Sequence, residues 1–148
     1  MKRSIITFVI LVFCSVTCFY GTAEALLPEA DKLVGVWVTA GGDEIEIHRE
    51  GEKYSGKPVV DPDGEKRLDV NNPDKTLRGR CLGDVEILND FEYTGKNRWK
   101  KGNVYDPDNG QTYQGTITMK SDDEIKLRGF VGISFFGRTE IWRRLAAE

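Results

Sequence analysis

Residues 106–120, DPDNGQTYQGTITMK, decide the fold. Asp106–Gly110 is rich in residues that favour turns, and Gln111–Lys120 is then predicted to be a strand, within which Thr116–Lys120 alternates polar and apolar side chains. A period of two is typical of a β-strand with one buried face. A second turn is predicted at Ser121–Asp123, followed by a further strand at Glu124–Val131. This stretch therefore predicts an antiparallel hairpin in an all-β protein.

Short strands separated by turn clusters extend to both sides of this hairpin. Pro28 and apolar residues at helical spacing predict one or two helical turns within Leu26–Leu33. Further strands are expected at Gly35–Thr39, Glu44–His48, Glu52–Val60, Asp84–Leu88, Phe91–Tyr93, Arg98–Lys100, Asn103–Tyr105 and Arg138–Leu145. The periodicity fails from Leu68 to Gly83, where Asn72 and Pro73 fit the start of one helical turn within a loop.

Eight to ten short strands without a long amphipathic helix predict an antiparallel barrel or sandwich. A barrel is favoured, because a short helix leading into Gly35-x-Trp37 fits a lipocalin-like, calycin-type β-barrel. Trp37 is then expected at the closed end, with Arg143 or Arg144 over its indole face. Trp37 and Arg143 are the structural candidates. The alternative is that Trp37 and Trp142 are ordinary core aromatics.

The first 25 residues predict a secretory signal peptide. A basic start precedes an apolar run from Ile5 to Tyr20, and Ala23 with Ala25 match a small-residue cleavage site. This run is short for a transmembrane helix, which needs roughly 20 apolar residues. Cleavage after Ala25 leaves residues 26–148 as a single β-barrel domain. The expected location is periplasmic or secreted.

Composition excludes several classes of site. The 21 Lys and Arg against 24 Asp and Glu give a net charge of -3, which argues against nucleic-acid binding. Cys81 is the one cysteine beyond the predicted signal peptide, and His48 is the single histidine. A zinc site needs several such ligands, and no nucleophile motif accompanies His48. We therefore predict no metal, no cofactor and no recognised catalytic constellation.

Five segments together resemble a known family: Asp69–Asp74, Leu77–Arg80, Tyr105–Tyr113, Leu127–Gly132 and Phe136–Trp142. They are similar to the secreted bacterial proteins grouped as domain of unknown function 2147. The resemblance covers nearly the whole chain after the signal peptide. It implies a lipocalin-like fold, an exported location and, by analogy, small-molecule binding. It brings no established catalytic residue.

One strand places an arginine beside an aromatic anchor. Arg138, Glu140 and Trp142 share a face, so they all point inward if Trp142 does. An interior Arg138 is either paired with a carboxylate, such as Glu140 or Asp106, or free to bind a ligand carboxylate or phosphate. The sequence leaves both interpretations open.

The candidate ligand-binding residues combine arginines, aromatic residues and one acid. Tyr105 and Tyr113 either line the pocket or form cross-strand pairs. Phe135 and Phe136 form either an apolar lip at the barrel mouth or a plug. The full set is Arg78, Arg80, Tyr105, Asp106, Tyr113, Arg128, Phe135, Phe136, Arg138 and Trp142.

The leading hypothesis is a secreted or periplasmic barrel that binds a small amphipathic or hydrophobic molecule. Its acidic headgroup is expected at Arg138, Arg78 or Arg80. The alternative is a solid barrel that acts as an envelope interaction module, with transient membrane or envelope-protein contact. A third hypothesis is a hydrolase of unknown substrate that uses Asp106. The sequence carries no signal for the oligomeric state.

Overall fold

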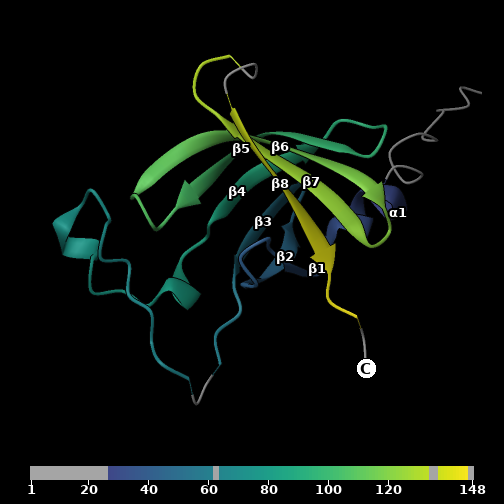
Figure 1. The fold of residues 1–148 in the computed structure, drawn as a ribbon. Helices are drawn as coiled ribbons and strands as arrows, with labels where there is room; N and C mark the ends of the chain where they lie inside the picture. The colour runs from purple at the N-terminus through teal and green to yellow at the C-terminus, as the bar shows by residue number, and fades with distance from the viewer. Residues whose placement is uncertain (1–26, 62–63, 134–136, 147–148) are drawn as a thin grey trace, which may run out of the picture.

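Eight antiparallel strands form a closed barrel within the residues that the computed structural model describes, 27–61, 64–133 and 137–146. Each strand pairs with the next, and the last returns to the first (Figure 1). The strands are β1 (Gly35–Val38), β2 (Glu44–Glu50), β3 (Lys53–Pro58), β4 (Leu88–Tyr93), β5 (Arg98–Asp106), β6 (Gln111–Ser121), β7 (Glu124–Phe130) and β8 (Gly137–Arg144). The antiparallel barrel predicted from the sequence is confirmed. The predicted signal peptide lies outside the described residues.

Short helices accompany the barrel. The expected N-terminal helical turns are α1 (Leu27–Ala30) and the 3-10 helix η1 (Asp31–Leu33). Two more 3-10 helices, η2 (Lys75–Leu77) and η3 (Leu82–Asp84), lie in the connection from β3 to β4, which extends away from the barrel (Figure 1). None of the described helices is long and apolar enough to cross a membrane.

Three local predictions are corrected by the structure. Asp84–Leu88 is not a strand, because η3 leads into β4 only at Leu88; an apolar run this short fits more than one backbone conformation. Arg98–Lys100 and Asn103–Tyr105 belong to one strand, β5, which bulges where Lys101 has a φ of 63°. The cap of η2 is Asp74, whose side chain accepts from the Thr76 N–H, and not Asn72.

Trp37 and Arg144 close one end of the barrel. The guanidinium carbon of Arg144 lies 4.2 Å from the centroid of the Trp37 ring. Arg144 also donates to the carbonyls of Lys32 and Val34, at 2.5 and 3.0 Å. The Trp37 Nε1 donates to the Leu33 carbonyl at 2.9 Å. These contacts of Arg144 join β8 to the helical turns that cover this end of the barrel.

The arginine over Trp37 is Arg144. The sequence indicated Arg143 or Arg144 for this position, and the choice of Arg143 as the structural candidate is wrong. Alternation along β8 puts Arg144 on the same face as the buried Trp142, and Arg143 on the opposite face. The Arg143 side chain is 76% exposed and pairs with Glu124 at 3.5 Å.

Aromatic side chains fill the barrel near this closed end. Trp99 is fully buried, with the rings of Tyr93 and Tyr54 at 5.0 and 6.3 Å between centroids. Phe91 packs against two glycines on β5 and β6: a Cβ at Gly102 or Gly115 would lie within 2.4 or 2.5 Å of its ring. The glycines thus make room for the large Phe91 ring.

We expect Arg144→Ala to destabilise the protein by about 2 kcal/mol, because it removes a cation–π contact and hydrogen bonds from a charged donor. Arg143→Ala is the matched control and should change stability by less than about 0.5 kcal/mol, since its ion pair is solvent-exposed. Urea unfolding followed by far-ultraviolet circular dichroism measures both. Equal effects would contradict the assignment of the closure to Arg144.

Candidate functional site

The end of the barrel opposite α1 is hollow. A cavity of about 1090 Å³ lies between the β1–β2 turn, the segment that follows β3, the β5–β6 hairpin and the facing ends of β7 and β8. Ile45, Leu127 and Trp142 give it an apolar inner wall. Its volume suits a small organic molecule.

A row of inward-facing side chains on β8 runs from the mouth of this cavity to its inner wall. Arg138, Glu140 and Trp142 all line the cavity, as expected if Trp142 faces the interior. The exposed fraction of the side chain falls along the row, from 84% for Arg138 to 30% for Glu140, while Trp142 is buried. Arg138 pairs with Glu140 at 3.2 Å, and Trp142 donates its Nε1–H to Glu140 at 3.1 Å.

Five of the ten candidate ligand-binding residues line the cavity. They are Tyr105, Asp106, Tyr113, Arg138 and Trp142. Tyr113 accepts a hydrogen bond from the Asn109 side chain at 2.9 Å, which holds its hydroxyl to the β5–β6 turn. Phe135 and Phe136 lie outside the described residues.

Three predicted arginines are not among the described residues that line the cavity. Arg78 donates its Nε–H to the Asn72 carbonyl at 2.7 Å, within the β3–β4 connection. Arg80 pairs with Asp69. Arg128 follows the inward-facing Leu127 on β7 and donates to Thr139 on β8 at 2.8 Å.

Asp106 is held in the turn that it begins. One of its carboxylate oxygens accepts from the Asp108 backbone N–H and the other from the Asn109 side chain, both at 2.9 Å. These are the contacts of a turn-forming aspartate. Within the described residues no group of three His, Cys, Asp or Glu side chains could hold a metal ion.

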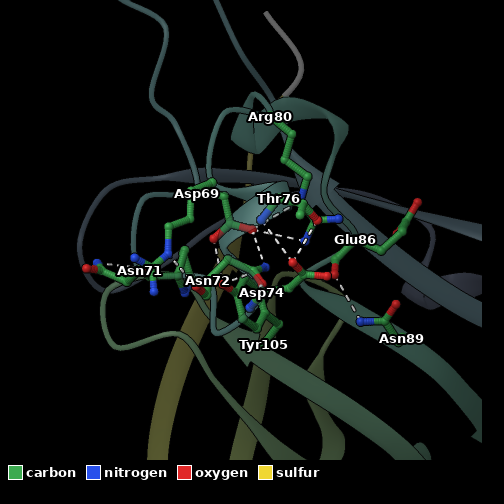
Figure 2. Close-up of polar contacts among 11 residues, drawn as sticks. Asp69, Asn71, Asn72, Asp74, Thr76, Arg80, Glu86, Asn89 and Tyr105 are labelled. Atoms are coloured by element: carbon green, nitrogen blue, oxygen red, sulfur yellow. Dashed lines mark hydrogen bonds and ion pairs between the residues drawn. The ribbon is translucent and has the colours of Figure 1, made fainter.

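A buried aspartate, Asp69, is the feature that the sequence reasoning missed. Its carboxylate is fully buried and accepts from the Tyr105 hydroxyl at 2.5 Å, from Asn72 at 2.8 Å and from two nitrogens of Arg80 at 3.0 and 3.1 Å (Figure 2). Asp69 lies in a segment quoted for the family resemblance, but no periodicity there indicated its burial. The cluster joins the β3–β4 connection to β5 beside the cavity.

The charges in this cluster are mutually stabilising. Burial by itself raises the pKa of Asp69, but the hydrogen bonds from Tyr105, Asn72 and Arg80 outweigh burial and hold the pKa below its ordinary value of 3.8. Burial and the neighbouring Asp69 carboxylate raise the pKa of Tyr105 to about 12. At neutral pH Asp69 is therefore ionised and Tyr105 carries its proton.

The Asn71 side chain links the β3–β4 connection to the β5–β6 turn by hydrogen bonds. Its side-chain nitrogen donates to the carbonyls of Pro107 and Asp108, at 3.0 and 2.9 Å. Gly110 has a φ of 70°, and a Cβ there would lie 1.9 Å from the Asn71 carbonyl oxygen. Glycine is therefore required at this position. Two segments far apart in the sequence thus form one rigid rim beside the cavity.

A closed eight-stranded antiparallel barrel, covered at one end by a helical turn and hollow at the other, is a lipocalin-like fold. The chain belongs to the family described as "Uncharacterized protein conserved in bacteria (DUF2147)", whose model matches residues 35–144. The predicted family and fold class are both confirmed.

A solved structure supports the fold. Protein HP1028 from the human pathogen Helicobacter pylori, described as belonging to the lipocalin family, is similar with a TM-score of 0.71 and 26% sequence identity. The similarity covers 77% of this chain and 83% of that chain. No curated protein matches the sequence.

The pKa of Tyr105 predicts a specific alkaline effect. Protonated Tyr105 contributes fully to the free energy of unfolding below its ordinary pKa of 10.0. This contribution is lost as pH rises towards a pKa of about 12. We therefore expect wild type to be more stable than Tyr105→Phe at pH 8, and this difference to shrink by about 2–3 kcal/mol between pH 10 and pH 12. Urea unfolding at fixed pH steps measures it. A difference that stays constant above pH 10 would contradict the Asp69–Tyr105 contact.

Proposed function

We propose that this protein binds a small amphipathic or hydrophobic molecule in the cavity of its barrel. The observation that carries the proposal is a cavity of about 1090 Å³ with an apolar inner wall and polar residues at its mouth. Ligand pockets commonly combine an apolar body with a few polar groups that fix orientation. The relative described as a lipocalin supports the same type of fold.

The cavity favours this function over the two alternatives. A solid barrel has its interior filled by side chains. Here aromatic side chains fill the barrel around Trp99 and Phe91, and the cavity lies between them and the mouth. Contact with an envelope partner through Phe135 and Phe136 concerns residues outside the described part of the chain. For hydrolysis, Asp106 has both oxygens engaged in its turn.

Whether the cavity can bind an acidic headgroup depends on the arginine side chains that line it. The acidic headgroup expected from the sequence would meet Arg138, since Arg78 and Arg80 hold the β3–β4 connection. Arg138 is paired with Glu140, and Arg67, the other arginine among the described residues that line the cavity, is paired with Asp43 at 2.5 Å. An acidic group at either arginine would lie beside one of these carboxylates.

Gly129→Phe provides a direct test of the cavity. Gly129 lines it, and a Cβ there meets Tyr113 at an ordinary distance of 3.6 Å, so a larger side chain enters the open space without backbone strain. We expect Gly129→Phe to weaken binding of the neutral probe N-phenyl-1-naphthylamine by at least about tenfold, measured by its fluorescence.

Gly79→Phe is the matched control, because a Cβ there meets nothing within 4 Å and Gly79 does not line the cavity. It should leave probe binding unchanged. Equal probe affinity in wild type and Gly129→Phe, with both proteins folded, would place the probe outside the cavity and remove the support for this function.

We also propose that the protein is exported, on the basis of its basic start, apolar run and Ala23-x-Ala25 site. Expression of the full chain in a bacterial host should yield a periplasmic or secreted protein that starts at Leu26. Intact mass measurement and N-terminal sequencing check this. Retention of Met1 in the purified envelope fraction would contradict cleavage.

A further inference from the structure

Carboxylates dominate the mouth of the cavity. Among the described residues that line it, seven are acidic and two are basic, Arg67 and Arg138. The acidic residues extend from Asp43 in the β1–β2 turn to Glu140 on β8. A concave site lined mainly by one sign of charge concentrates ligands of the opposite sign.

Both arginines are already neutralised by carboxylates within the site. Arg67 lies 2.5 Å from Asp43, and Arg138 lies 3.2 Å from Glu140. A ligand carboxylate or phosphate at either arginine would therefore be repelled by the carboxylate already paired there and by the remaining acids of the mouth. The charge balance disfavours an anionic ligand.

Glu140 is placed to receive a cation. Its Oε2 accepts from the Nε1–H of the buried Trp142, which fixes the carboxylate against the inner wall of the cavity. The other oxygen, Oε1, meets Arg138. The Arg138 side chain is 84% exposed, so it can turn into water and leave this oxygen to an incoming group at little cost, because exposed ion pairs are weak.

We propose that the cavity selects an amphipathic molecule with a positively charged nitrogen, which takes the place of Arg138 at Glu140 while its apolar part lies against Trp142, Leu127 and Ile45. This inference rests on the proposed function and names the ligand class for the same cavity. Glu140 is its specificity-determining residue.

Matched ten-carbon probes test the charge preference. Decyltrimethylammonium, decanoate and decanol are titrated separately, below their micelle-forming concentrations, against bound N-phenyl-1-naphthylamine at pH 7.5. We expect the cation to displace the dye from wild type at about tenfold lower concentration than decanoate, because it gains one charge–charge attraction at Glu140. Glu140→Gln should reduce this preference strongly, and Arg138→Gln should increase it.

Two controls separate charge recognition from damage to the fold. Decanol displacement should be the same in wild type and Glu140→Gln, which shows that the apolar wall is intact. Glu124→Gln removes a carboxylate that pairs with Arg143 and does not line the cavity, so the preference for the cation should persist.

The outcomes distinguish the inference from the proposed function. Decanoate that matches or exceeds the cation, or a preference that is unchanged in Glu140→Gln, would overturn the cationic selectivity while dye and decanol binding still support a ligand cavity. If neither the dye nor any ten-carbon probe binds wild type, the proposed function fails, and the inference fails with it.

Discussion

The barrel depends on a short junction between its first and last strands. β1 and β8 are paired at two positions, Trp37 with Arg144 and Val38 with Arg143, whereas β6 and β7 are paired along most of their length. The cation–π contact and the backbone hydrogen bonds of Arg144 reinforce this short pairing at the closed end of the barrel. An open sheet would expose the edges of β1 and β8, so closure at this point gives the other six strands a stable cylinder.

The second constraint is a buried charge outside the main aromatic core. A fully buried carboxylate is unfavourable unless it is hydrogen-bonded and paired, and Asp69 has three partner residues. Because these partners come from both the β3–β4 connection and β5, satisfying the charge also orders a long segment with little regular structure. The rim beside the cavity owes its position to polar contacts, while the closed end owes its position to aromatic packing.

The sequence predicted the features that depend on neighbouring residues. Alternation along β8 put Arg138, Glu140 and Trp142 on one face, and the same alternation distinguishes Arg144 from Arg143 once Trp142 is known to be buried. The Asp69 cluster could not be found in this way, because its partner Tyr105 is 36 residues away. The same limit explains Arg80, which was expected at a ligand and instead pairs with an aspartate buried by tertiary packing.

The three tryptophans divide the barrel into separate optical environments. Trp37 lies under a guanidinium at the closed end, Trp99 lies among tyrosine rings, and both are sealed from solvent. Trp142 borders the cavity, with its indole N–H bound to a carboxylate. A molecule that enters the cavity therefore touches one of the three tryptophans directly, so the protein carries an intrinsic fluorescence reporter for occupancy together with two internal references for the integrity of the barrel.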